Sequence, residues 1–265
     1  MSVPVALTIA GSDSSGGAGI QADLKTFSAL GVYGTSVLTA LTAQNAKGVS
    51  AIHQVPAEFI TAQMDAVFSD LDIGAVKIGM LGNVTAVAAV GAGLRRHRAR
   101  NVVLDTVMAA SSGGKLLPDD AIDALRGLMA QVRLVTPNLP EAAVLTGATQ
   151  ARDEAEMVAQ ARKLLTLGAG AVLIKGGHAS GSESVDILVE DASVTRLALP
   201  RIDSSNTHGT GCTLGSAIAA GLAKNLALVD AVRQAKAYVA GAIEAADRLE
   251  IGSGSGPLHH FHKWW

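Results

Sequence analysis

A glycine-rich turn directly before an apolar segment is the feature of this sequence that most clearly indicates chemistry. The turn reads HGTGC over residues 208–212, and residues 213–223 follow it as the apolar segment. Glycines let successive backbone N–H groups turn toward one point, where the positive end of a following helix adds to their field. We therefore predict an anion site at the N–H groups of Gly209, Thr210 and Gly211, suited to a phosphoryl group in transfer.

Cys212 stands at the start of this predicted helix and is the single cysteine of the chain. A helix N-terminus lowers the pKa of a thiol, and a small side chain leaves room beside a reacting oxygen. The alternative is a capped helix with an inert, buried cysteine, because free cysteines are often part of the core. The other motifs must decide between these two interpretations.

Short β-branched runs alternate with longer stretches of helical period, which is typical of βαβ units and a mostly parallel sheet. The expected strands cover residues 5–10, 75–78, 102–105, 134–136 and 171–175, and the expected helices cover residues 20–30, 56–71, 84–96, 118–131, 153–167, 212–223 and 229–249. A turn-rich gap between residues 185–189 and 194–197 predicts a hairpin at the sheet edge. In the last helix, Ala235, Val239, Ala242 and Ala246 are expected in the core, and Lys236, on another face, is expected either in solvent or reaching the site.

Polar residues follow the carboxyl ends of the expected strands, where an open parallel sheet binds its ligands. The first strand leads into a loop rich in glycine and serine over residues 11–19, which can wrap a small polar molecule. Four further polar residues at or just after strand ends are Asp105, Asn138, Glu141 and Lys175. Such residues at successive strand ends rarely arise by accident, so we expect them to meet at one edge of the sheet.

These strand-end residues suit the binding of a nucleotide with its metal. Asn138 and Glu141 share one face at a helix start, and their oxygens suit Mg²⁺ held through waters beside phosphates. Alternatively, Asn138 caps the helix and Glu141 completes a capping box. Lys175 begins the run KGGH over residues 175–178, a possible phosphate contact. Asp105 either points into the same crevice or caps the next loop.

Common nucleotide-binding motifs do not explain the sequence. Residues 17–22 fit the dinucleotide pattern G-x-G-x-x-G/A, but they lie too far beyond the strand and lack the acidic residue that holds a ribose. The P-loop pattern is missing. Residues 112–115 fit S-x-x-K without its companion motifs, so we interpret them as a plain loop.

Length and composition indicate one large domain with a well-buried core. The chain has 265 residues, of which 49% are hydrophobic and 17% charged. We expect a single domain over residues 1–265, with residues 252–265 as a C-terminal tail docked on it. Trp264 and Trp265 should pack on the body of the domain because so aromatic an end rarely floats free.

Charge and cysteine content limit the partners and the location of the protein. A formal net charge of -2 and a pI near 6.4 give no electrostatic footprint for nucleic acid. A single cysteine excludes an internal disulfide, and the N-terminal segment has neither a charged leader nor a membrane-spanning apolar run. We therefore expect a cytoplasmic protein that binds neither nucleic acid nor membranes.

Taken together, the motifs resemble those of ribokinase-like kinases that act on vitamins and their precursors. The closest resemblance is to the bacterial hydroxymethylpyrimidine and phosphomethylpyrimidine kinases of thiamine synthesis. It rests on residues 10–23, 42–45, 77–81, 136–138 with Glu141, 175–178 and 208–212, and so extends over essentially the whole chain. The resemblance implies a three-layer α/β/α sandwich with a mostly parallel sheet, a homodimer, and ATP with Mg²⁺ as phosphoryl donor.

The resemblance also implies roles for individual residues. Gln44 would bind the pyrimidine ring, in a pocket lined by Gly11, Asp23, Met80 and Val107. The anion hole would comprise Gly209, Thr210, Gly211 and Cys212. Lys175, Asp105 and Asn138 would face ATP, and Asn138 with Glu141 would lie near the metal. The implied reaction phosphorylates 4-amino-5-hydroxymethyl-2-methylpyrimidine and then its monophosphate.

The sequence departs from the wider family at Cys212, where an aspartate is usual. An aspartate is a natural base for a substrate alcohol, but phosphoryl transfer gains most from positioning and charge stabilisation. We hypothesise that a neutral thiol permits two transfers in one site. A fixed carboxylate would repel an ionised monophosphate by about 4 kcal/mol for unit charges about 4 Å apart at an effective dielectric of about 20.

Three other functions remain open at this point. A pyridoxal kinase would bind a ring of similar size in an apolar pocket. A non-catalytic vitamin sensor could keep the fold, because fold alone never proves chemistry, although a mere binder would not need the polar residues at the strand ends. Metal storage by His259, His260 and His262 is disfavoured by their spacing, which is poor ligand geometry.

Overall fold

The structure is a computed structural model that describes residues 3–109, 114, 116–177 and 181–265. His178 and most of the loop at residues 112–115 lie outside the described residues. In the described part of the chain, nine strands form one sheet in the order β3-β2-β1-β4-β5-β6-β7-β8-β9. The strands are β1 (Val5–Asp13), β2 (Tyr33–Asn45), β3 (Gly48–Gln54), β4 (Ala75–Ile78), β5 (Val102–Leu104), β6 (Leu134–Val135), β7 (Val172–Lys175), β8 (Glu183–Glu190) and β9 (Ser193–Pro200).

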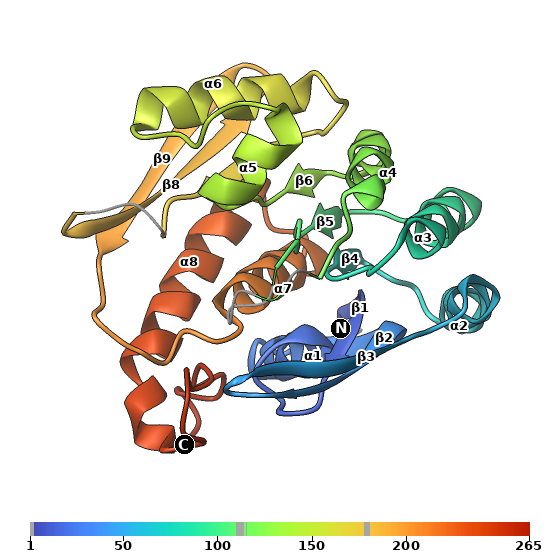
Figure 1. Cartoon of the computed structure of the whole chain (residues 1–265), viewed down its shortest axis with the longest axis horizontal. Coiled ribbons are helices and arrows are strands. Elements are labelled where there is room, and N and C mark those ends of the chain that lie inside the picture. Colours follow the sequence, from blue (N-terminus) through green and yellow to red (C-terminus); the bar gives the residue numbers. More distant parts are fainter. Residues whose placement is uncertain (1–2, 110–113, 115, 178–180) are drawn as a thin grey trace.

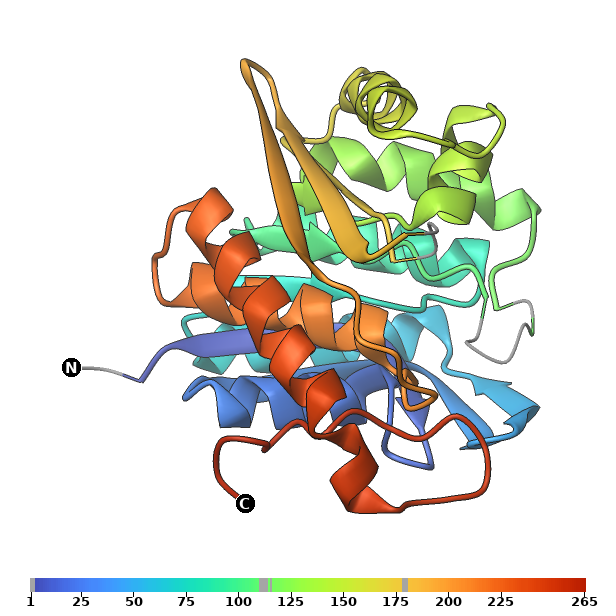
Figure 2. The same cartoon turned by 90° about the vertical axis from the view of Figure 1, so that its left-hand side faces the viewer.

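Helices cover both faces of the sheet (Figures 1 and 2). One face carries α2 (Ala57–Asp70), α3 (Val84–Arg96), α4 (Asp120–Leu128), α5 (Leu139–Thr146) and α6 (Glu154–Leu165). The other carries α1 (Gly19–Ala29), α7 (Thr210–Ala223) and α8 (Leu228–Glu244). Strands β2, β1, β4, β5, β6 and β7 run parallel, and β3, β8 and β9 are antiparallel additions at the edges. The predicted α/β/α sandwich is confirmed.

Strand β4 shows why the sheet needs a helical layer on each face. All four of its side chains are buried, and they alternate between the two layers. Val76 and Ile78 pack in the core beneath α2 and α3, whereas Ala75 packs in the core beneath α7. Lys77 lies between these apolar residues and is also fully buried, so it needs a partner of opposite charge.

Helix α7 is the central element of its layer and fixes the glycine-rich turn at the sheet edge. Every residue from Thr213 to Ala223 is buried, because α1 and α8 flank the helix and the sheet lies beneath it. Its sequence is dominated by small residues, which permit this close packing on all sides. The N-terminus of α7 is therefore held firmly above the ends of the central strands.

Most predicted elements are present, including the edge hairpin of β8 and β9. The hairpin of β2 and β3 was not predicted, because β3 is largely exposed and lacks a clear apolar pattern. Helix α5 was only foreseen as a helix start. The last helix ends at Glu244, and a separate short 3-10 helix, Ala246–Leu249, follows it.

The C-terminal tail contacts the body mainly through its middle. Leu258, His259 and His260 are buried. Trp264 and Trp265 remain 69% and 67% exposed, so they are not packed into the body as expected, but Trp264 Nε1 donates to the carbonyl of Ala29 at 3.3 Å. Backbone hydrogen bonds, such as that from the His259 N–H to the carbonyl of Ala242, also anchor the segment. None of the helices in the described residues combines the length and apolar character that crossing a bilayer requires.

Candidate active site

A cavity of about 850 Å³ opens at the carboxyl ends of the parallel strands. This is the edge where the strand-end residues were predicted to meet. The predicted site residues that line the cavity are Gly11, Gln44, Met80, Asp105, Val107, Asn138, Glu141, Lys175, Gly209, Thr210, Gly211 and Cys212. Asp23 is the predicted site residue that does not line it.

The turn before α7 requires glycine at its first position. Gly209 precedes the helix with φ +85°, in the left-handed region, and a Cβ atom there would lie 1.9 Å from the carbonyl oxygen of Gly17. In the described structure, the N–H groups of Gly209, Gly211 and Cys212 donate to no protein acceptor. These three groups are therefore available to an anion in the cavity that the residues line.

Thr210 differs from its neighbours in this turn. Its N–H donates to the carbonyl of Thr207 at 3.2 Å, and its hydroxyl donates to the same oxygen at 2.7 Å. The prediction that the Thr210 N–H faces the anion is therefore wrong. Cys212 replaces it, because that residue lies in the first turn of the helix, where N–H groups have no intrahelical acceptor.

The Cys212 thiol is neutral, as the hypothesis of two transfers requires, although its place at a helix N-terminus favours a lower pKa. Burial is the largest influence and raises the pKa of the thiol to about 11. The charge of Lys77 lowers it, but the carboxylates of Asp23 and Asp105 raise it again. The helix N-terminus does not overcome these effects, so the thiol keeps its proton at physiological pH.

Asp105 and Lys175 form an ion pair beside the N-terminus of α7. Lys175 Nζ lies 2.8 Å from Asp105 Oδ1, and both side chains are largely buried. A Cβ atom at Gly211 would lie 3.5 Å from Lys175 Nζ, which places the pair directly next to the free N–H groups. Burial works to raise the pKa of Asp105, but Lys175 and Lys77 outweigh it and lower that pKa. The pair is therefore charged.

Asn138 and Glu141 form the capping box of α5. Asn138 Oδ1 accepts the N–H of Glu141 at 2.9 Å, and Glu141 Oε2 accepts the N–H of Asn138 at 2.9 Å and the hydroxyl of Thr106 at 3.0 Å. Both residues also line the cavity, so their part in the capping box does not keep them from facing a ligand.

The donor set fits a magnesium ion bound mainly by phosphates and water. Within the described residues, no cluster of three or more His, Cys, Asp or Glu side chains is arranged to hold a metal. Among the same residues, Glu141 Oε1 has no hydrogen-bond partner, and Glu141 lines the cavity. Mg²⁺ beside a nucleotide needs few protein ligands. Glu141 is suited to be such a ligand. Asn138 contributes by holding Glu141 in place through the capping box.

Asp23 lies beneath the cavity and not in it, so its predicted role in the pyrimidine pocket is wrong. Its carboxylate accepts hydrogen bonds from Lys77 Nζ at 2.8 and 2.9 Å, and from the hydroxyls of Thr8 and Ser216 at 2.6 Å each. Asp23 and Lys77 are fully buried. The signal in the sequence is Lys77, a charged residue within the apolar strand β4, because a buried cation needs a carboxylate partner such as Asp23.

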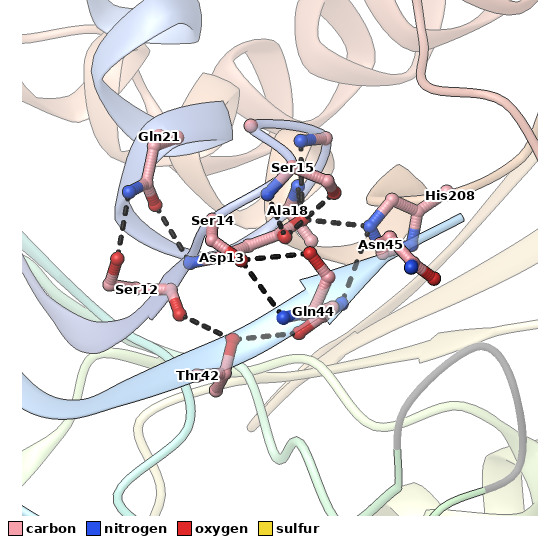
Figure 3. Close-up of polar contacts among 12 residues, drawn as sticks. Ser12, Asp13, Ser14, Ser15, Ala18, Gln21, Thr42, Gln44, Asn45 and His208 are labelled. Carbon is pink, nitrogen blue, oxygen red and sulfur yellow. Dashed lines mark hydrogen bonds and ion pairs between the residues drawn. The ribbon is translucent and has the colours of Figure 1, made fainter. Parts of the chain in front are cut away.

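A polar cluster around Asp13 and His208 was not predicted as part of the site (Figure 3). His208 Nε2 lies 2.8 Å from Asp13 Oδ2, and both residues are buried and line the cavity. Burial works to raise the pKa of Asp13, but hydrogen bonds from His208 and Ser15 outweigh it and hold that pKa well below its usual range. The signal for this pair is the position of each residue: Asp13 ends β1, and His208 directly precedes Gly209.

A further buried ion pair also lines the cavity. Lys236 Nζ lies 2.6 Å from Asp186 Oδ2, and the N–H of Gly176 donates to Asp186 Oδ1 at 2.9 Å. Asp186 and Lys236 both line the cavity. Ala235, Val239, Ala242 and Ala246 are buried as predicted, but Lys236 faces the cavity and is buried as well.

Comparison with known sequences identifies the family. A family model described as phosphomethylpyrimidine kinase matches residues 13–259. A relative from Rhizobium meliloti (strain 1021), named hydroxymethylpyrimidine/phosphomethylpyrimidine kinase, is 60% identical over 262 residues, 98% of each chain. A relative of the same name from Escherichia coli (strain K12) is 54% identical over 261 residues, also 98% of each chain.

Comparison with solved structures agrees on the fold. The ADP complex of Bacillus subtilis pyridoxal kinase matches with a TM-score of 0.90 at 35% identity, covering 98% of both chains. The phosphomethylpyrimidine kinase from Clostridium difficile 630 matches with a TM-score of 0.81 at 42% identity, covering 90% of this chain and 99% of the other. The resemblance seen in the motifs is thereby confirmed, and this chain belongs to the phosphomethylpyrimidine kinase family.

Proposed function

We propose that this protein transfers the γ-phosphoryl group of ATP to 4-amino-5-hydroxymethyl-2-methylpyrimidine, and then transfers a second one to the monophosphate, in thiamine biosynthesis. The observation that carries the proposal is the composition of the cavity, where the amide of Gln44 and the free N–H groups of the α7 turn share one space. The names of the relatives support the same reaction.

The residues of the cavity divide into an acceptor side and a donor side. Gln44, Gly11, Met80 and Val107 would hold the pyrimidine, and a Cβ atom at Gly11 would lie 2.5 Å from Met80 Cε, so the wall there is close-packed. Lys175 would contact the phosphates of ATP, and Asp105 keeps it charged and positioned. The titles of neighbouring structures in complex with ADP and with AMP-PCP support a nucleotide co-substrate.

The reaction needs positioning and charge stabilisation more than a strong base. The N–H groups of Gly209, Gly211 and Cys212 would stabilise the charge on the transferred phosphoryl group. Cys212, with its thiol protonated, adds no negative charge beside the acceptor. The second acceptor is already an ionised phosphate, so it needs no base and meets no fixed carboxylate at this position.

Magnesium would be held at the Glu141 side of the cavity. Bound Mg²⁺ supplies neutralisation of the phosphate charges during transfer. Glu141 would hold it, directly or through water, and the capping box with Asn138 fixes the carboxylate in place. Thr106 supports the same carboxylate from beneath.

We further propose that the protein is a cytoplasmic homodimer with small-molecule partners only. The edge hairpin of β2 and β3 supports self-association, because Leu41 and Ile52 on it and Phe59 close by expose large apolar side chains. The cytoplasm supplies ATP, and the single cysteine needs no oxidising compartment. Light scattering of the purified protein tests the dimer directly.

Pyridoxal phosphorylation is the second candidate activity. It is favoured by one observation, the structural match with pyridoxal kinases at TM-scores of 0.90 and 0.91. A non-catalytic sensor is disfavoured because it would need neither the Asp105–Lys175 pair nor the three free N–H groups.

The experiment is a measurement of ADP release with the hydroxymethylpyrimidine, its monophosphate and pyridoxal as separate acceptors. We expect turnover with both pyrimidines and a large rise in KM for them in Gln44→Ala. The exposed Gln150→Ala serves as the matched control and should leave all parameters unchanged. Turnover with pyridoxal alone would overturn the proposal in favour of the second candidate, and no turnover would favour the sensor.

A further inference from the structure

The orientation of the Gln44 amide is set by the two polar side chains that flank it. Gln44 Oε1 lies 3.2 Å from Thr42 Oγ1, and Gln44 Nε2 lies 3.5 Å from His208 Nε2 (Figure 3). A side-chain amide has an acceptor oxygen on one side and a donor nitrogen on the other. The protons on its neighbours decide which of the two amide orientations is the stable one. The proton positions on Thr42 and His208 can be worked out from their other partners.

The hydroxyl proton of Thr42 is already used. Thr42 Oγ1 donates to the carbonyl of Ser12 at 2.8 Å, and a hydroxyl has one proton to donate. Toward Gln44 it can therefore only accept a hydrogen bond. The amide nitrogen of Gln44, and not its oxygen, is the group that completes a hydrogen bond with Thr42.

His208 Nε2 lies 2.8 Å from Asp13 Oδ2, and the other partners of Asp13 decide which of the two atoms carries the proton. Its partner Asp13 also accepts hydrogen bonds from the N–H groups of Ser15 and Ala18 at 2.8 Å each, and from the hydroxyl of Ser15 at 2.7 Å. A carboxylate held by so many donors is ionised and can only accept, so His208 Nε2 carries the proton. A protonated ring nitrogen has no lone pair to accept a hydrogen bond from the amide N–H groups of Gln44, and the partial positive charge of this N–H attracts the amide oxygen.

We propose that the Asp13–His208 pair is a specificity-determining and positioning device, which together with Thr42 turns the Gln44 amide oxygen toward His208 and so fixes the orientation of the pyrimidine. The inference rests on the proposed function. A 4-aminopyrimidine offers an amino donor beside a ring acceptor, so an amide can pair with both, its oxygen with the amino group and its nitrogen with the ring.

The direction of the reacting group follows from this pairing. On the pyrimidine ring, the carbon that bears the hydroxymethyl group adjoins the amino-bearing carbon on the side away from the ring acceptor. With the amide oxygen on the His208 side, the hydroxymethyl group lies on that side too, toward the turn that begins at Gly209. The opposite amide orientation would direct it toward Thr42.

Selectivity between the 4-amino pyrimidine and its analogue lacking the amino group tests the proposal. The ratio of kcat/KM for the two should be about 100 or more in the unmodified enzyme, because a site built to pair an N–H group rejects the analogue that lacks it. In His208→Phe this ratio should fall at least about 10-fold, since the amide loses one of its two fixing partners. His208→Gln, which can place an N–H near the same position, should restore most of it.

Two further variants separate positioning from general loosening of the fold. Thr42→Val removes the hydrogen-bond acceptor at the other end of the amide and should lower the same selectivity ratio. This variant keeps the proposal testable if His208→Phe does not fold. His260→Phe is the matched control, because His260 is equally buried and contacts Thr213 of α7 but is not a hydrogen-bond partner of Gln44. It should leave the ratio unchanged.

The outcomes distinguish this inference from the proposed function. Selectivity unchanged in both His208→Phe and Thr42→Val would overturn the inference while leaving the kinase activity standing. An equal loss in His260→Phe would also overturn it. Absence of turnover with either pyrimidine in the unmodified enzyme would overturn the proposed function itself.

Discussion

Lys77 Nζ lies 2.8 Å from Asp23 Oδ1, and both side chains are completely shielded from solvent. The pair joins β4 to α1 directly beneath the turn that carries Cys212. Removing one partner leaves the other charge buried without compensation, which usually costs about 3–5 kcal/mol. The pair therefore connects the stability of the fold with the electrostatics of the site.

Lys77→Met should lower the free energy of unfolding by about 3–5 kcal/mol, because Asp23 would then be buried without its counter-charge. Urea denaturation followed by circular dichroism measures this change. Arg196→Met is the control, since Arg196 pairs with Glu154 and Glu183 on the surface and should change stability far less. Equal, small effects in both variants would show that the buried pair is dispensable.

Gly209→Ala should lower kcat by about 100-fold or more, because anion-hole donors contribute on this scale. The new Cβ would collide with the carbonyl of Gly17 and displace the turn. KM for the pyrimidine should change little. Gly127→Ala is the control, because that glycine has no atom within 4 Å of a built Cβ. Full activity of Gly209→Ala in steady-state kinetics would refute the anion hole.

The protonation of Cys212 predicts how its reactivity depends on pH. Burial raises the pKa of this thiol from 9.0 to about 11, so the folded protein should react slowly with iodoacetamide at neutral pH, with a midpoint near pH 11. Protein unfolded in urea is the control, with an expected midpoint near 9. The same shift stabilises the fold below pH 9 and is lost as pH rises through about 11. A midpoint near 7 would mean that a thiolate is present.

Cys212→Asp should slow the second phosphorylation far more than the first. Repulsion of about 4 kcal/mol between a carboxylate and an ionised monophosphate corresponds to a factor of up to about 1000. Cys212→Ser keeps a neutral group and should preserve the ratio of the two rates. Single-turnover assays with each acceptor give that ratio. If the second step stays intact relative to the first in Cys212→Asp, charge at this position does not govern the double transfer.

The sequence was sufficient to predict the fold, and all the predicted site residues except Asp23 line the cavity. Buried parallel strands such as β4 and β5 are short apolar runs, and ligand residues follow strand ends in any open parallel sheet. For Asn138 and Glu141 the sequence offered a metal site or a capping box, and the two residues form the box while lining the cavity. Local patterns were informative here because local geometry decides these features.

The errors concern properties that depend on residues far apart in the chain. The resemblance implied a place for Asp23 in the pocket, and its pairing with Lys77, 54 positions away, is not apparent from spacing. The protonation of Cys212 could not be predicted from its place at a helix start, because helix position is local, whereas burial is not. The role of His208 emerges only when it meets Asp13, 195 positions away.

The most direct test of the account is the mass of the product formed from 4-amino-5-hydroxymethyl-2-methylpyrimidine with ATP and Mg²⁺. We predict two successive gains of one phosphoryl group, with the monophosphate appearing first and then being consumed. A product that stops at the monophosphate would contradict the double transfer. A phosphorylated product from pyridoxal but none from the pyrimidine would contradict the assigned substrate.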